Sequence, residues 1–428
     1  MATSTWQRYL YNPELLRYWL IIKLDLLIVP YAFTVYWVKY IDQGNINNAY
    51  VSGMATELGF HGNELVQFQT IFTVGNVVAL LPFMYLFPRV PMHYLYRATS
   101  YAEIMAYRFM VSIFEACYFP GVHYVLGSWY KSNEIGRRGG AFYVGLTLGY
   151  LTASLLQSAT LDNLDGVHGL AGWRWLFIVN AIITLPLAVI GCFIYPGTID
   201  KPNRLVISEK DLVIARKRLE KQGNTVHSAP FSWSLIKKIF GTKHFWLVLL
   251  WDSLFFNSSA NTASFLLWLQ SLHRFSESRL NQLNSISPAL GIFFILFINF
   301  STDLFLERAW AITLASSINF SSLVILAIWN VPESAKWFAY SVQYSAVAVS
   351  SILYGWVNVI YRDSIEERAV VLVLVTAIST SRTAWIPLFT YPTVEGPRFV
   401  HGYSFSAAIT GLLVVMTFFI RWVYGPDG

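Results

Sequence analysis

The chain has 428 residues, of which 55% are hydrophobic and only 13% are charged, against about 25% charged residues in an ordinary soluble protein. Together with a mean hydropathy of +0.47, this composition excludes a soluble fold and predicts an all-α membrane protein. The net charge of +6 does not call for a nucleic-acid partner, because an excess of basic residues in cytoplasmic loops explains it.

Eleven apolar blocks are candidate membrane-spanning helices, each of which needs roughly 20 residues to cross a bilayer. In chain order they cover residues 24–40, 68–87, 104–126, 141–156, 175–195, 245–268, 286–300, 309–329, 337–361, 369–388 and 403–422. At about 30 to 36 residues for each helix and its loop, a chain of this length should hold about twelve crossings. One crossing is therefore missing from the count.

The longest polar connection, residues 200–243, is strongly basic and is expected on the cytoplasmic side. Within it, the spacing of Ser208 and Asp211 is typical of a capping box and predicts a short amphipathic helix along the inner membrane surface. This connection divides the chain into an amino-terminal bundle (1–199), the basic loop (200–243) and a carboxy-terminal bundle of six helices (244–428). Such a two-bundle organisation is typical of major facilitator transporters.

Loop charges locate the missing crossing. The amino terminus and the loop with Arg137 and Arg138 are basic and should be cytoplasmic, whereas residues 42–64 contain no Lys or Arg and should be outside. The second block must then end inside and the third must begin outside, yet no apolar run of span length lies between them. We predict a twelve-span parent architecture that lacks its third helix, near 90–103. A true count of eleven, with a different amino-terminal topology, is the alternative.

Charged residues at membrane depth cost about 2.5 to 3.5 kcal/mol each on insertion scales, so each needs a partner or a function. Arg108 and Glu115 are seven residues apart, which places them on one helix face about 10 Å apart. We expect Glu115 to bind a proton and Arg108 to hold an anion in a central cavity. A snorkelling Arg108 with a structural Glu115 is the alternative.

Other polar residues are further candidates. Asp25 and Asp252 are predicted to assist in proton coupling, although an interfacial anchor and interhelical hydrogen bonding would also explain them. Asn257 and Asn261 belong to a polar run that should break its helix near mid-membrane, where transporters contact substrate. Arg382, about 20 Å inside its block, is a candidate clamp for a carboxylate, or else a structural salt-bridge partner.

Motifs of other functional classes are not found. The sequence has no phosphate-binding loop, zinc-ligand spacing or nucleophile elbow, so no enzyme activity, ATP-driven transport, metal or cofactor is expected. The two cysteines, Cys117 and Cys192, lie inside apolar blocks and imply no disulfide framework.

Several strings are similar to a known family. They are Tyr40–Met54, Arg108-Phe109 with Glu115-Ala116, Phe119–Lys131, Gly169–Phe177, Arg362–Ala369 and Thr383–Trp385. On these strings the chain resembles the fungal allantoate permease group, anion:cation symporters of the major facilitator superfamily. Within that group it looks most like the fungal biotin (vitamin H) and pantothenate proton symporters.

The resemblance implies proton-coupled uptake of a small anionic vitamin across the plasma membrane by a monomer with both termini cytoplasmic. It matches Arg108 and Glu115 to the fourth-helix motif, and Asn45, Asn47 and Asn48 to the end of the first helix, with Asn45 and Asn48 as candidate substrate contacts. The chain departs from the family where an Asp-Arg pair becomes Asp42-Gln43. An allantoate, ureidosuccinate or nicotinate permease, a non-transporting receptor and an inactive remnant are the alternatives.

Overall fold

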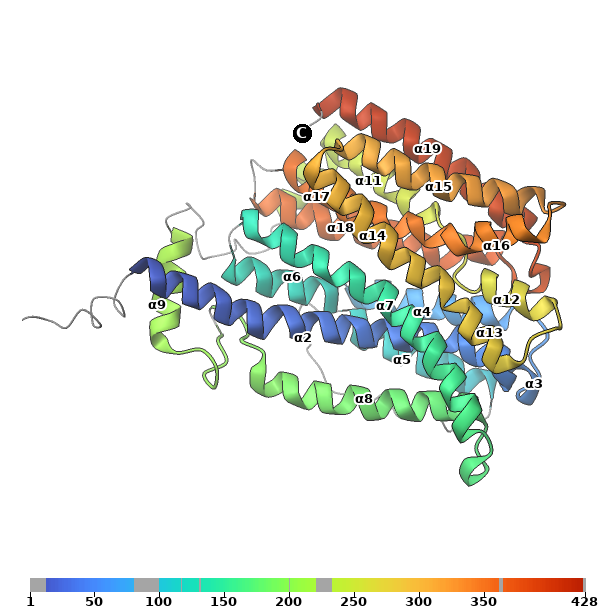
Figure 1. Ribbon diagram of the computed structural model, residues 1–428. Coiled ribbons are helices and arrows are strands. Elements are labelled where there is room, and N and C mark those ends of the chain that lie inside the picture. Colours follow the sequence, from blue (N-terminus) through green and yellow to red (C-terminus); the bar gives the residue numbers. More distant parts are fainter. Residues whose placement is uncertain are drawn as a thin grey trace, which may run out of the picture.

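The computed structural model describes residues 13–80, 100–116, 118–130, 132–199, 201–220, 233–361 and 365–425. These residues form helices and short connections, with one isolated antiparallel bridge between Gly197 and Pro202. Figure 1 shows the long helices running roughly along one direction, with α9 across one end of the molecule. Below, the end that carries α9 is called the α9 end, and the opposite end, which carries α3 and α13, is called the far end.

The first half of the chain contains long helices joined by short turns. Its elements are α2 (Pro13–Ala49), the π-turn η1 (Tyr50–Met54), α3 (Ala55–Glu57), α4 (Glu64–Leu80), α5 (Tyr101–Ala116), α6 (Tyr118–Trp129), α7 (Ser132–Leu164), η3 (Val167–Gly169) and α8 (Gly172–Ile194). The predicted exterior segment 42–64 is wrong in its first part, because α2 continues to Ala49 and the turn at Gly53, with φ +98°, leads directly into α3.

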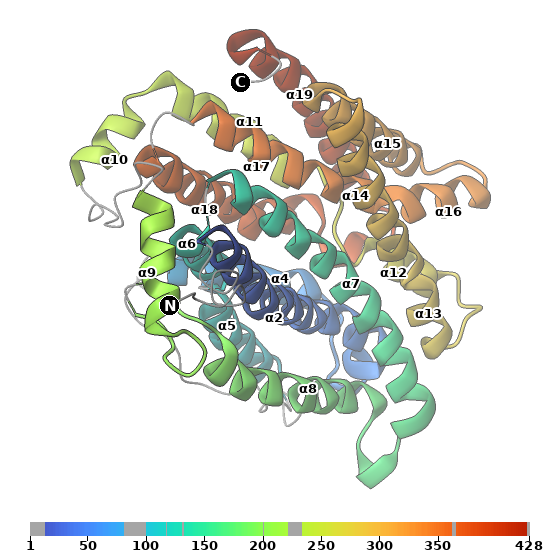
Figure 2. The same ribbon diagram turned by 60° about the vertical axis from the view of Figure 1, so that its left-hand side comes forward.

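The second half begins after the amphipathic loop helix. Its elements are α9 (Glu209–Glu220), α10 (Trp233–Phe240), α11 (Lys243–Asn257), α12 (Ser264–Ser271), α13 (Glu277–Asn284), α14 (Ile286–Leu304), α15 (Arg308–Ile328), α16 (Glu333–Val342), η4 (Gln343–Ala348), α17 (Val349–Ile360), α18 (Ile365–Thr390), η5 (Thr393–Glu395) and α19 (Val400–Tyr424). The predicted break in the polar run is confirmed, since α11 ends at Asn257 and α12 begins at Ser264. Figures 1 and 2 show α8 and α19 on opposite sides of the molecule.

Six helical stretches among the described residues are long and apolar enough to cross a membrane by themselves. They are Tyr18–Glu57, Gly172–Ile194, Glu277–Thr302, Arg308–Ile328, Val370–Thr390 and Val400–Tyr424. Several other predicted spans coincide with helices that are broken or more polar, such as α11 with α12 and α16 with α17. The chain is therefore a multi-pass membrane protein, while the count of eleven spans stays a prediction.

Helices α4 and α5 run in the same direction. Tyr101 donates a hydrogen bond to Gln67 over 2.7 Å, the Arg108 guanidinium lies over the Phe72 ring, and Ser112 lies against Gly75, so positions rise together along both helices. Alternate helices of an up-and-down bundle have this relation, whereas consecutive ones are antiparallel. The predicted gap falls mainly on residues 81–99, outside the described residues, and stays a prediction.

The two halves share one hydrophobic core at the far end but have separate cores at the α9 end. The shared core joins Met54, Phe68 and Trp173 of the first half to Trp268 and Tyr403 of the second. Towards the α9 end, one core contains only first-half and α9 residues, and the buried residues of the other all come from α10 and later elements. Because van der Waals packing and interhelical hydrogen bonds hold membrane helices together, the shared core joins the halves at the far end.

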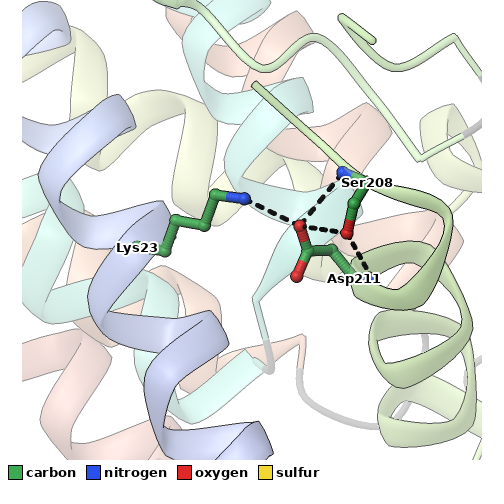
Figure 3. Close-up of polar contacts among 3 residues, drawn as sticks. All are labelled: Lys23, Ser208 and Asp211. Atoms are coloured by element: carbon green, nitrogen blue, oxygen red, sulfur yellow. Dashed lines mark hydrogen bonds and ion pairs between the residues drawn. The ribbon is translucent and has the colours of Figure 1, made fainter. Parts of the chain in front are cut away.

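Helix α9 is fixed to the first half by its start (Figure 3). Lys23 of α2 pairs with Asp211 over 2.8 Å, and the Ser208 amide and hydroxyl donate to the same carboxylate over 3.0 and 2.9 Å. This is the predicted capping box. Leu212 and Ala215 pack in the first-half core. Although burial acts to raise the pKa of Asp211, the hydrogen bonds from Lys23 and Ser208 hold this pKa below its ordinary value.

Asp211→Asn should loosen α9. The substitution removes the ion pair with Lys23, whose loss costs about 1 kcal/mol at a partly exposed site. We expect tryptic cleavage of the connection 201–243 to become about fivefold faster. Because the folded-state pKa of Asp211 is lowered, its stabilisation is present at neutral pH and is lost only as the pH falls through that lowered value. The ratio of the variant's cleavage rate to that of the unmodified chain should therefore not vary between about pH 6 and 8.

The matched control for this experiment is Glu209→Gln, which removes an exposed ion pair with Arg204 inside the same loop. Equal cleavage rates for the two variants would contradict the proposed attachment of α9 to α2 through Asp211.

Candidate functional site

A cavity of ≈ 200 Å³ lies between the two halves, where α2, α4 and α5 face the α11–α12 break and α18. Its lining combines amides and hydroxyls with aromatic rings and one charged side chain. The lining residues are Gln43, Asn47, Gln69, Phe72, Thr73, Arg108, Tyr150, Phe256, Asn257, Ser259, Ala260, Asn261, Thr262, Thr383, Ile386, Pro387, Thr390, Tyr391, Phe405 and Ser406. Such a cavity suits a small molecule with a polar or anionic end and an apolar body.

Arg108 is the charged residue of the cavity wall. Its side chain is only 1% exposed and its guanidinium carbon lies 4.4 Å from the centre of the Phe72 ring. Asp42 is the acidic partner, at 3.8 Å between Nη1 and Oδ2, which is too long for a hydrogen bond. Among the described residues, Nε and Nη1 have no hydrogen-bond acceptor. The guanidinium is thus held in position with donors left over for an anion.

Glu115 lies two turns beyond Arg108 on α5, is buried, and does not line the cavity. Neither of its carboxylate oxygens has a hydrogen-bond partner within the described part of the chain. Lys39 of α2 donates to the Glu115 backbone carbonyl over 3.3 Å, and the charges of Lys39, Asp42 and Arg108 all act on the Glu115 carboxylate. Four charged groups, two of each sign, therefore form one cluster inside the first half, with Asp42, Arg108 and Glu115 buried and Lys39 half-buried.

The helix break presents its amides to the cavity, as expected. Asn257 and Asn261 both line it. Asn261 donates through Nδ2 to Gln69 Oε1 over 2.9 Å, and its own Oδ1 accepts from the Ala263 amide over 2.8 Å, which stabilises the non-helical turn. The sequence feature that located these two residues was therefore the polar run that interrupts an apolar helix.

A family model described as Major Facilitator Superfamily matches residues 32–387 of the chain. The chain belongs to the major facilitator superfamily. It is 38% identical to the Vitamin H transporter of Saccharomyces cerevisiae, over 95% of this chain and 72% of that one. It is 31% identical to the Pantothenate transporter liz1 of Schizosaccharomyces pombe, over 95% of this chain and 82% of that one.

Solved structures support the same fold. A POT family transporter in complex with 5-aminolevulinic acid superposes with a TM-score of 0.60, over 93% of this chain and 96% of that one. The sequence identity is 12%, so this likeness concerns the fold alone. The predicted all-α major facilitator fold is confirmed, whereas the predicted number of spans and the missing helix stay predictions.

Asp25 and Asp252 lie away from the cavity of this facilitator. Asp25 accepts a hydrogen bond from Tyr130 over 2.7 Å near the α9 end of α2. Asp252 of α11 is fully buried, with Ser379 and Tyr354 as its polar neighbours, and neither oxygen has a well-aligned hydrogen bond within the described residues. The structure does not bring these two carboxylates to Arg108.

Three other candidates also miss the lining. Arg382 is half-buried in α18 next to the lining residue Thr383, without being part of the wall itself. Asn45 is fully buried and both its amide atoms lack partners among the described residues, whereas Asn48 accepts a 3.5 Å hydrogen bond from Asn284. In the described part of the chain, no group of three or more His, Cys, Asp or Glu side chains could hold a metal ion.

Asp42 and Gln69 were not among the predicted site residues, and Asn47 was matched only through the resemblance at the end of the first helix. Asp42 is buried, accepts from Asn180 over 3.1 Å, and is the counter-charge of Arg108. Its position had been assigned to an exterior loop. Asn47 and Gln69 are uncharged, so the insertion cost that identified Arg108 and Glu115 is not a signal for them. To predict from the sequence that Asp42 is buried, one would have had to recognise that the first helix continues as far as the turn that follows it.

Gly75→Ala should disturb Arg108 through packing. A Cβ at position 75 would lie 1.8 Å from Ser112 Oγ and 2.9 Å from the Phe109 carbonyl oxygen, so α4 would have to move away from α5. We expect a destabilisation of about 1 to 3 kcal/mol, measured by thermal unfolding of the purified protein.

A Cβ at Gly355 meets nothing within 4 Å, so Gly355→Ala serves as the matched control and should be neutral or slightly stabilising. The double variant Gly75→Ala with Ser112→Gly should recover part of the stability, since it removes the closest clash and leaves the 2.9 Å approach to the Phe109 carbonyl oxygen. Failure of this rescue, with Gly75→Ala itself destabilising, would show that the contact with Ser112 is not the cause.

Proposed function

We propose that this chain is a proton-coupled symporter that takes up a small organic monocarboxylate, a vitamin such as biotin or pantothenate. The observation that carries the proposal is the buried Arg108 guanidinium, which lines the cavity between the halves with hydrogen-bond donors to spare. The names of the two relatives, a vitamin H transporter and a pantothenate transporter, support the substrate class. The allantoate permease group that the sequence resembles is the family context of the proposal.

In this proposal, the substrate carboxylate binds Arg108. A guanidinium presents parallel N–H donors that match a carboxylate, and the stack on Phe72 fixes their plane. The amides of Asn257 and Asn261 offer hydrogen bonds to a ureide or amide group at the other end of the substrate. Asn45, Asn48 and Arg382 remain secondary candidates, since they flank the cavity wall instead of forming it.

Proton coupling is proposed at Glu115. A carboxylate on the same helix as Arg108, buried and without hydrogen bonds in the described part of the chain, gains from neutralisation when a second anion approaches. Moving one proton with a monoanion also removes the cost of carrying negative charge against an inside-negative potential, about 2.3 kcal/mol per 100 mV. Asp25 and Asp252 are the further proton-coupling candidates.

The sidedness follows the loop charges. The basic connection 200–243 and α9 are placed in the cytoplasm, with both termini on the same side and the far end facing outward. The protein would act as a monomer in the plasma membrane, with bundles over residues 1–199 and 244–428. Since the halves share a core only at the far end, the described conformation corresponds to one closed towards the outside.

Glu115→Gln should abolish accumulation of substrate without abolishing its exchange across the membrane. The substitution removes the titratable group and keeps the side-chain shape. In cells that lack their own carriers, the steady-state ratio of internal to external labelled biotin or pantothenate reached by the unmodified chain should rise about tenfold per unit of pH gradient and collapse with a protonophore. Glu115→Gln should only equilibrate the label.

Glu103→Gln provides the matched control, because Glu103 lies on the same helix and is exposed. Full accumulation by Glu115→Gln would remove this residue from the mechanism, and protonophore-insensitive uptake by the unmodified chain would rule out proton coupling. Asp25→Asn and Asp252→Asn, measured alongside, show whether either carboxylate takes part.

The parent architecture is proposed to have a helix between α4 and α5. Their parallel directions support this, since consecutive membrane helices normally alternate. We expect sequencing of the transcript across residues 95–101 to reveal about 20 additional, mostly apolar residues. A transcript without them, from a chain that gives no uptake, would favour a receptor or an inactive remnant.

A further inference from the structure

Four polar side chains tie the two halves together beside the cavity. Asn47 of α2 donates to Thr262 over 3.1 Å, and Asn261 donates to Gln69 of α4 over 2.9 Å. Gln69 in turn donates to Asn47 over 2.8 Å. Since residues 261 and 262 are adjacent in the chain, these three hydrogen bonds close a ring that contains two side chains from each half. This ring is called the amide ring below.

All four members of the amide ring also line the cavity. The groups that hold the halves together are therefore the same groups that a molecule in the cavity would contact. Gln69 uses its amide nitrogen within its own half and its amide oxygen across the interface. Asn47 does the reverse, with its amide oxygen accepting from Gln69 and its amide nitrogen donating across the interface to Thr262.

Further links at the far end lie outside the cavity. Asn281 donates to Ser52 over 2.8 Å, and the Val66 amide donates to Thr393 over 3.2 Å. With the shared hydrophobic core, these contacts close the far end. The shared core also reaches the cavity through Phe72 and Tyr391, but the hydrogen bonds of the amide ring are the ones between the halves that a polar group in the cavity can exchange, so they can connect what happens in the cavity to that closure.

We propose that Gln69 is a positioning residue that couples the cavity to the far-end gate. By accepting the Asn261 N–H it holds the α11–α12 break against α4, so the far end stays shut while this hydrogen bond persists. A ureide or amide oxygen of a substrate takes the same N–H, and the gate is then held by the outer links alone. The kinetic consequence of this coupling rests on the proposed transport function, whereas its effect on access does not.

Access to the cavity from the far end provides the direct test. In a background with Cys117→Ser and Cys192→Ser, the reporter Ser259→Cys places one thiol in the cavity wall. Labelling by a membrane-impermeant maleimide is measured on whole cells, relative to His168→Cys on the exposed far-end turn η3. If His168→Cys is not labelled in whole cells, the measurement is repeated on sealed membrane vesicles of the opposite orientation.

Gln69→Met should label the reporter about tenfold faster, because it removes hydrogen bonds that together favour the shut state by about that factor. Gln67→Met is the matched control: it makes the same change two residues earlier on α4, where the hydrogen bond to Tyr101 stays within the first half. The control should leave reporter labelling unchanged. A Gln69→Met rate no faster than that of the control would overturn the proposal.

Transport kinetics distinguish gating from a structural effect. If Gln69→Met shifts the resting carrier towards the outward-open state, KM for uptake and the maximal rate should fall together. A loss of folded carrier would lower the maximal rate alone, and a lost substrate contact would raise KM; either pattern contradicts the coupling. A chain that does not transport at all, yet shows faster labelling, would refute the proposed function and leave the gate intact.

Thr262→Val supplies a second variant if Gln69→Met does not reach the membrane. It removes the acceptor for Asn47 on the other side of the amide ring and should also accelerate labelling, to a smaller extent. Unchanged labelling in this variant would mean that the amide ring does not hold the gate.

Discussion

The need to bury the Arg108 guanidinium inside a membrane protein determines much of the surrounding structure. A charge at membrane depth is tolerated only with a partner or a polar cavity. Here α4 provides the Phe72 ring, and α2 provides Asp42 at 3.8 Å. The close approach of α4 to α5 that brings Phe72 over the guanidinium requires Gly75, because a Cβ there would collide with Ser112. The charge, the stack and the glycine thus form one constraint.

The balance of charge around Arg108 also involves Glu115, two helical turns further along α5. Lys39, Asp42, Arg108 and Glu115 form a cluster with two charges of each sign. An arriving carboxylate makes this cluster net negative unless one acid takes a proton, and Glu115 is the acid without hydrogen bonds to lose. In the proposed mechanism, protonation of Glu115 and anion binding at Arg108 would therefore favour each other through electrostatics alone, without any movement of the helices.

The features that could be predicted from the sequence are those with a large effect on free energy. Arg108 and Glu115 were found because charges are costly in membranes, and the α11–α12 break because a polar run interrupts an apolar block. The start of α9 was found because Ser208 and Asp211 form a capping box. Asp42 was misplaced, since the α-helix α2 continues to Ala49, well beyond the end of its apolar block. Arg382 was predicted at the cavity. Whether a residue lines the cavity or flanks it depends on the rotation of its helix about the helix axis. A helix that is hydrophobic on all sides has no apolar pattern from which this rotation could be predicted.

Asn47 and Gln69 illustrate a further limit. A neutral amide in a membrane helix costs little when it finds any partner, and interhelical hydrogen bonds of this kind are individually weak. Their significance comes from where the two halves meet, which is a property of the assembled fold. The amide ring is both cavity wall and interface. If Gln69 couples the cavity to the far end as proposed, a change at Asn261 that adapts the cavity to a different substrate would also alter the balance between the shut and open states, so selectivity and gating would not be adjustable independently there.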